Sequence, residues 1–158
     1  MLSKLTMLND NILCRINDTL LVIGNNIMEY VTLYDVKTDE FRMLEEKFNV
    51  SKLVKFDDKL IIIEQATFRT QHNRINIINV EILKCIDKID YIGIIRDMAF
   101  INEYAIMPIY SKIVVMNLKD GAVYQEIDGY DYSCKFAQLN EEQFAISKNN
   151  QIFIYQNI

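Results

Sequence analysis

Short runs of alternating apolar and polar residues, separated by polar pairs, recur along the whole chain. One example is LVKF at 53–56 followed by KLIIIEQ at 59–65, with Asp57-Asp58 between them. Asn and Asp tolerate the left-handed backbone angles of two-residue hairpin turns. No segment of useful length has the 3.6-residue period of a helix. The pattern predicts an all-β fold, with further hairpins at Asn17-Asp18, Asn102-Glu103 and Asn140 to Glu142.

These runs repeat with a long, regular period. Equivalent positions in four copies are Tyr34, Ile78, Met116 and Tyr155, which are 44, 38 and 39 residues apart. Each lies in a third strand, after the two strands of a predicted hairpin. A period of about 40–45 residues is typical of a four-stranded propeller blade. The predicted blades span roughly residues 9–46, 47–90, 91–129 and 130–158.

The strand count indicates how the blades could form a ring. The fourth copy stops after its third strand, whereas residues 3–8 (SKLTML) form an unassigned strand before the first copy. Pairing these two strands would remove two open sheet edges. The sequence therefore predicts a single all-β domain over 1–158, a small β-propeller of about four four-stranded antiparallel blades, with the last blade closed by the N-terminal strand. The alternatives are an incomplete ring, a ring completed by a partner, and a β-sandwich.

Two segments carry a resemblance to a known family, namely VTLYDVKTDEF (31–41) and IVVMNLKDGAV (113–123). They resemble the third-strand, turn and fourth-strand stretch of WD-repeat propellers, with Tyr34-Asp35 as the aromatic-Asp pair and Asp120-Gly121 as the turn. The chain departs from the family pattern because it has no Trp. The resemblance implies a divergent WD-repeat-like β-propeller. Other copies replace the Asp of the pair with Asn79, Asn117 and Gln156.

Charge and hydropathy narrow the classes of partner. The net charge of −5 argues against a broad nucleic-acid-binding face, because phosphate neutralisation requires basic residues. The longest apolar stretches, such as 60–63, have four residues, against about 20 for a membrane-spanning helix. The segment 1–10 lacks the apolar core of a signal peptide. We expect no membrane association and a cytoplasmic or nuclear location.

Few residues point to catalysis or metal binding. His72 is the one histidine, the four glycines are scattered singly, and the three cysteines are far apart, so we expect free thiols, no metal and no cofactor. Carboxylate pairs such as Glu45-Glu46 and Asp57-Asp58 fall at predicted turns. They support only a weaker alternative, a carboxylate-based hydrolase or a lectin-like binder in the central channel.

The longest predicted loop, residues 65–74, offers the clearest candidate surface. It combines aromatic and basic residues, which are enriched at binding hot spots, and long loops in compact repeats are often functional. We therefore predict a non-enzymatic interaction or scaffold module that binds a protein partner. The alternative is a ribosome-associated factor whose basic loop contacts RNA. The predicted partner-binding residues, including tyrosines at blade junctions on the same face, are Phe68, Arg69, His72, Arg74, Tyr91, Tyr130 and Tyr132.

Overall fold

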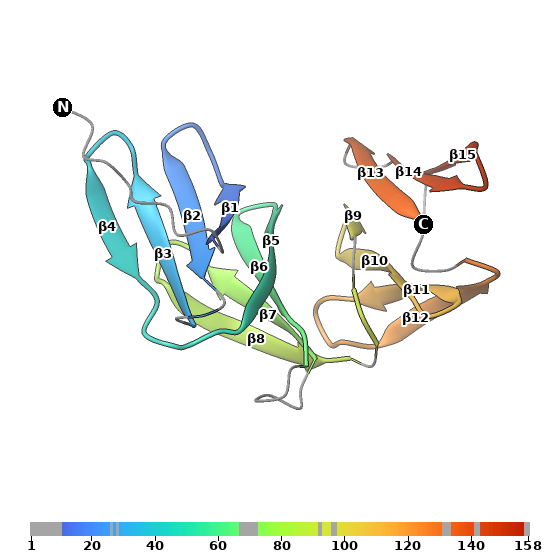
Figure 1. The fold of residues 1–158 in the computed structure, drawn as a ribbon, viewed down its shortest axis with the longest axis horizontal. Helices are drawn as coiled ribbons and strands as arrows, with labels where there is room; N and C mark the ends of the chain where they lie inside the picture. Colours follow the sequence, from blue (N-terminus) through green and yellow to red (C-terminus); the bar gives the residue numbers. More distant parts are fainter. Residues whose placement is uncertain are drawn as a thin grey trace. The chain divides into compact units, whose positions relative to one another are not determined.

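The computed structural model describes residues 11–25, 27, 29–66, 73–91, 93–95, 98–130, 134–140 and 143–156 (Figure 1). These residues form fifteen β-strands and no helix. The strands are β1 (Asn11–Arg15), β2 (Leu20–Asn25), β3 (Tyr30–Asp35), β4 (Glu40–Met43), β5 (Val50–Phe56), β6 (Lys59–Glu64), β7 (Arg74–Asn79), β8 (Lys84–Asp90), β9 (Ala99–Ile101), β10 (Tyr104–Ile109), β11 (Lys112–Asn117), β12 (Val123–Asp128), β13 (Lys135–Asn140), β14 (Gln143–Lys148) and β15 (Gln151–Gln156).

The strands pair into four antiparallel sheets, each built from consecutive strands. The sheets are β1-β2-β3-β4, β5-β6-β7-β8, β9-β10-β11-β12 and β13-β14-β15. The predicted all-β fold with four propeller blades is confirmed. The fourth sheet has three strands among the described residues. The predicted closing strand, residues 3–8, lies outside the described residues.

The four repeat positions occupy the same place in four strands. Tyr34, Ile78, Met116 and Tyr155 are each the fifth residue of a third strand, in β3, β7, β11 and β15. Their partners on the second strands are Leu21, Leu60, Ala105 and Phe144. The sequence period therefore corresponds to one blade per copy.

The sheets gather into two compact units, residues 1–88 and 89–158. In the first unit, Val22 and Leu33 of one sheet pack in a core with Leu53 and Ile62 of the next. Burying each such side chain contributes roughly 1.5–3 kcal/mol. The core of the second unit joins its two sheets in the same way, through Ile106, Val115, Phe144 and Ile146. The single domain expected from the sequence stays a prediction.

The central strands of the two middle sheets are buried on both faces, and β15 of the last sheet is not. Successive residues of a strand point to opposite faces. Leu60 and Ile61 are both 0% exposed, as expected of the continuous apolar run in β6. In β15, by contrast, Ile152 and Ile154 are 74% and 64% exposed, while the intervening Phe153 is half-buried.

The Asp or Asn that ends the third strand caps a turn. Asp35 Oδ1 accepts hydrogen bonds from the N–H groups of Lys37 at 2.8 Å and Thr38 at 3.2 Å. Asn79 and Asn117 form the equivalent contacts in the next two blades. A side-chain oxygen that accepts from the backbone two or three residues on is the signature of an Asx-turn. The Asn replacements in the repeat therefore preserve the capping function of the Asp.

Two of the predicted hairpin turns use a left-handed residue. Asp57 and Asn102, in the first hairpins of the second and third blades, have φ of 54° and 51°. Asn149 and Asn150, between β14 and β15, have φ of 50° and 61°. Positive φ at both central residues, as at Asn149 and Asn150, matches the twist of a tight hairpin. The expected left-handed residue is confirmed at Asp57 and Asn102, whereas the predicted turn at Asn17-Asp18 has no residue with positive φ and the turn at Asn149-Asn150 was not predicted.

Candidate interaction surface

The structure describes three of the seven predicted partner-binding residues. Arg74 is the first residue of β7 and pairs in register with Glu64. Tyr91 is buried, with 7% of its surface exposed, and Tyr130 is half-buried. The other predicted anchors lie outside the described residues, namely Phe68, Arg69, His72 and Tyr132.

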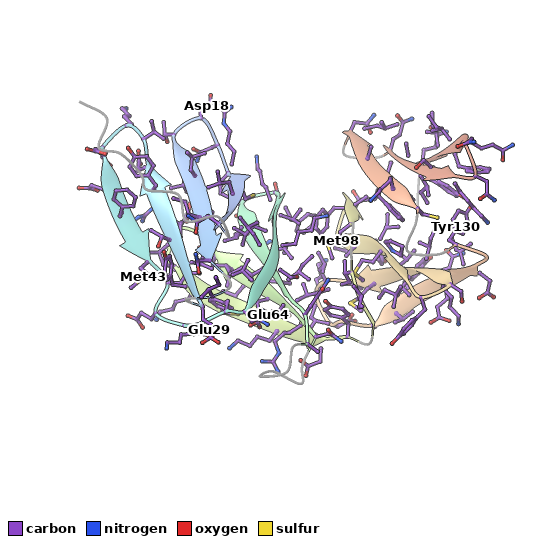
Figure 2. All side chains as sticks on the ribbon, in the orientation of Figure 1. Asp18, Glu29, Met43, Glu64, Met98 and Tyr130 are labelled. Atoms are coloured by element: carbon purple, nitrogen blue, oxygen red, sulfur yellow. The ribbon has the colours of Figure 1, made fainter. Side chains whose placement is uncertain are left out.

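A polar network holds the base of the long loop. Glu64, the last residue of β6, is labelled in Figure 2. Its Oε1 accepts the backbone N–H of Asn49 at 2.8 Å, and its Oε2 accepts Nδ2 of Asn76 at 2.8 Å. Asn76 is 1% exposed, so this is a buried amide with a charged acceptor. The network ties the segment before β5 to the ends of β6 and β7.

The two ends of the loop are also joined directly. Asn49 Nδ2 donates to the carbonyl of Gln65 at 3.0 Å. The N–H of Ala66 donates to Oδ1 of Asn73 at 2.8 Å, across the mouth of the loop. These contacts fix the backbone on both sides of residues 67–72. Side chains carried by the loop therefore start from an ordered base.

Charges around this base are mixed in sign. Lys88 Nζ forms an ion pair with Glu46 Oε2 at 2.5 Å, with both side chains nearly half exposed. The hydrogen bond to Glu46 raises the pKa of Lys88, while the nearby Arg74 guanidinium opposes the shift. Glu46 is thus a partner of Lys88 rather than a free carboxylate. The described cations at this end of the second blade have acidic neighbours.

Tyr130 joins the two sheets of the second unit. Its N–H and that of Gly129 donate to the carbonyl of Ser111, each at 3.1 Å, and its hydroxyl lies 2.6 Å from the Tyr155 hydroxyl. Lys148 Nζ lies 4.4 Å from the centroid of the Tyr130 ring. Burial, followed by the hydrogen bond to Tyr130, raises the pKa of Tyr155 to about 12. This junction tyrosine is engaged within its own unit.

The expected free thiols are present at all three cysteines. Burial is the main cause that raises the pKa of both Cys14 and Cys85, which keeps these thiols protonated. The described residues contain no group of three or more His, Cys, Asp or Glu side chains placed to hold a metal ion. They also contain no helix long and apolar enough to cross a membrane.

Sequence reasoning missed Glu64, Asn49 and Asn76. One signal was present, because Asn76 interrupts the apolar strand INIIN at 75–79. A polar residue inside a strand that is otherwise buried requires a hydrogen-bond partner. The identity of that partner depends on the pairing of β6 with β7, which places Glu64 two residue pairs from Asn76 on the same face of the sheet.

Comparisons with known proteins show that the chain is similar to others in fold. No protein-family model matches the chain, and no curated protein matches it in sequence. A computationally designed protein, Ika8, superposes with a TM-score of 0.67 at 12% identity, over 92% of this chain and 45% of the other. BamB from Moraxella catarrhalis superposes with a TM-score of 0.64 at 11% identity, over 90% of this chain and 42% of the BamB chain. The N-terminal domain of Nup159 superposes with a TM-score of 0.58 at 11% identity, over 94% of this chain and 45% of the other chain.

The chain spans less than half the length of these three structures. BamB and the Nup159 domain are both propellers. Identities this low carry information about fold and none about activity. Together with the four meander sheets, they show that this chain has a β-propeller fold.

Proposed function

We propose that this protein is a non-enzymatic interaction module, a propeller that serves as a subunit or accessory factor of a larger assembly. In this proposal it binds a protein partner in the cytoplasm or nucleus, through the 65–74 loop of the second blade. Propellers of the kinds it matches commonly mediate protein interactions. The fold alone is compatible with many functions, so the proposal depends on the loop.

The observation that carries the proposal is the ordered base of the loop. Glu64, Asn49 and Asn76 hold the ends of β6 and β7, and Asn73 closes the mouth through Ala66. Binding costs free energy when it must immobilise loops and side chains. A loop whose two ends are already held in place is expected to lose less conformational entropy when it binds a partner. Arginine is enriched among hot-spot residues, and Arg74 lies where the chain leaves the loop.

Affinity capture from the source cell tests the proposal. The wild-type chain is compared with a variant carrying Arg69→Glu and Arg74→Glu, and bound proteins are quantified by mass spectrometry. We expect recovery of a specific partner to fall by about tenfold or more, as for loss of interface hot spots. Arg42→Glu is the matched control, because Arg42 is an exposed arginine on β4 of the first blade. Equal recovery by the loop variant and the control would remove this loop from consideration.

The same experiment distinguishes a protein partner from RNA. Contacts to RNA phosphates weaken steeply with salt. We expect capture to survive nuclease treatment and a moderate increase in salt. Loss of all capture after nuclease treatment would favour the ribosome-associated alternative instead. Imaging of a tagged chain checks the expected cytoplasmic or nuclear location.

A further inference from the structure

The last sheet has an open edge at β15. This strand is at one edge of the order β13-β14-β15, and among the described residues no further strand lies beside it (Figure 1). The strand at the other edge, β13, contacts β9 of the third sheet. An edge strand presents a row of unpaired N–H and C=O groups to which another extended chain can bind. β15 therefore offers backbone hydrogen-bonding groups to a further strand.

β15 lacks the features that usually protect a sheet edge. Natural edge strands carry charged side chains, proline or a bulge, which hinder the addition of another strand. β15 reads QIFIYQ, with no charged residue and no proline, and it pairs with β14 without a register shift. The last strands of the other three sheets all carry charges, namely Glu40 and Arg42 in β4, Asp87 and Lys88 in β8, and Glu126 and Asp128 in β12.

Two apolar side chains of β15 are exposed on the face turned away from the core. Ile152 is 74% exposed and Ile154 is 64% exposed. Their partners on β14 are the small residues Ser147 and Ala145, whereas Phe144 on the opposite face is buried in the core of the second unit. Large exposed apolar side chains grouped on one surface mark an interaction site. The edge of β15 thus combines backbone groups with apolar side chains.

The first and third sheets show which kind of strand fits beside β15. Tyr155 occupies the same strand position as Tyr34 and Met116. Phe41 of β4 pairs with Tyr34 and stacks on its ring, with 4.5 Å between the ring centroids. Val123 of β12 pairs with Met116. Both neighbouring strands are antiparallel to the third strand. An antiparallel strand with an aromatic or aliphatic residue opposite Tyr155 therefore matches this edge.

We propose that β15 binds an extended segment of a partner protein, which pairs antiparallel with it as a fourth strand of the last sheet. Main-chain hydrogen bonds give such a contact its affinity, and alternate side chains give it specificity. The segment is uncharged at its centre, with aromatic or aliphatic residues opposite Phe153 and Tyr155 and β-branched residues beside Ile152 and Ile154. This contact goes beyond the proposed function, because it uses none of the residues of the 65–74 loop.

Titration of the full 158-residue chain with a synthetic peptide tests the proposal. The probe is KTVTFTVK, which alternates threonine with apolar residues and has a lysine at each end for solubility. The control peptide has the same side chains, but all of its central amides are N-methylated, so it cannot donate main-chain hydrogen bonds. We expect the probe to slow amide hydrogen exchange in β15 about tenfold or more, and the control peptide to leave the exchange unchanged.

Substitutions in the protein check the position of the site. Ile154→Lys places a charge on the open edge and should weaken probe binding about tenfold or more, because lysine on an edge strand hinders strand addition. Val123→Lys is the matched control, since Val123 is 52% exposed on β12, and it should bind the probe as the wild type does. Arg74→Glu should also bind normally, so failure of the loop proposal and failure of this one are separable. Far-ultraviolet circular dichroism checks that every variant is folded.

Four results would overturn the proposal. The first is the absence of probe binding, and the second is binding that leaves exchange in β15 unchanged. The third is equal binding of the probe and the N-methylated peptide. The fourth is slow exchange along all of β15 in the free chain, which would show that the edge is already paired, as it would be with the predicted strand at 3–8.

Discussion

Asn76 donates its side-chain amide to Oε2 of Glu64 at 2.8 Å, from a position in β7 that is 1% exposed. The same carboxylate accepts the backbone N–H of Asn49 through its other oxygen. One acidic side chain thereby joins three segments at the base of the predicted binding loop. Because Asn76 is buried, this contact should contribute to the stability of the second blade.

Removal of the amide should destabilise the first unit. We expect Asn76→Ala to lower its free energy of unfolding by about 1–3 kcal/mol, since a buried hydrogen bond to a charged group is lost. Urea titration followed by circular dichroism measures the change. Gln125→Ala, at an exposed residue of β12, is the control. Equal midpoints for the two variants would contradict a structural role for the Glu64 network.

The turn cap at Asp35 gives a prediction that uses the repeats themselves. Asp35→Asn should be tolerated, because Asn79 and Asn117 form the same contacts in other blades. Asp35→Ala removes the acceptor for two backbone N–H groups and should cost about 0.5–1.5 kcal/mol per hydrogen bond lost. Thermal unfolding of the two variants side by side checks this. If Asp35→Asn lowers the unfolding temperature as much as Asp35→Ala does, the side-chain hydrogen bonds of the Asx-turn are not what stabilises this turn.

Gly24 allows β2 to approach β5 closely. A Cβ added there would lie 2.9 Å from Cγ1 of Val50 and 3.1 Å from Cδ1 of Leu53. Overpacking of this kind typically costs about 1–3 kcal/mol. We therefore expect Gly24→Ala to destabilise the first unit, and Gly24→Ala combined with Val50→Ala to recover part of the loss in a urea titration. An unchanged midpoint for the single variant would show that the two sheets separate easily.

The phenol of Tyr155 predicts a loss of stability at high pH. Its ordinary pKa is 10.0, and burial and Tyr130 raise it to about 12 in the folded protein. Between these values the unfolded chain releases a proton that the folded chain retains, so the stability of the second unit falls as pH rises through this window. Below pH 10 the contribution is fully present.

Absorbance of the ionised phenol provides the measurement. Tyr155 should titrate near pH 12, and Tyr155→Phe should remove this phase, whereas Tyr34, whose pKa the hydrogen bond to Asp39 raises, should still titrate above its ordinary value. Tyr124→Phe, at a residue that is 62% exposed, is the control and should leave the late titration in place. A phase near pH 12 that is unchanged in Tyr155→Phe would contradict its assignment to Tyr155.

Local patterns were sufficient to predict the blades. The positions Tyr34, Ile78, Met116 and Tyr155 are equivalent in the structure because the spacing reflects one meander sheet per copy. The turns at Asp57 and Asn102 follow from the backbone preferences of those residues. Each of these features depends on residues close together in sequence.

Features that depend on pairing between strands could not be predicted in the same way. Glu64 and Asn76 are twelve residues apart in sequence, and only the pairing of β6 with β7 brings their side chains into contact. Tyr91 was expected at a surface junction, and its burial reflects packing that its flanking residues do not reveal. The exposure of Ile154 could not be predicted either, because the run IFIY has the composition of a buried strand.

The most direct test of the proposed interaction function is calorimetric titration of the purified partner with the chain. We predict that the variant carrying Arg69→Glu and Arg74→Glu binds at least about tenfold more weakly than Arg42→Glu, because the loop supplies the hot-spot residues. Identical dissociation constants for the two variants would contradict the assignment of partner binding to the 65–74 loop.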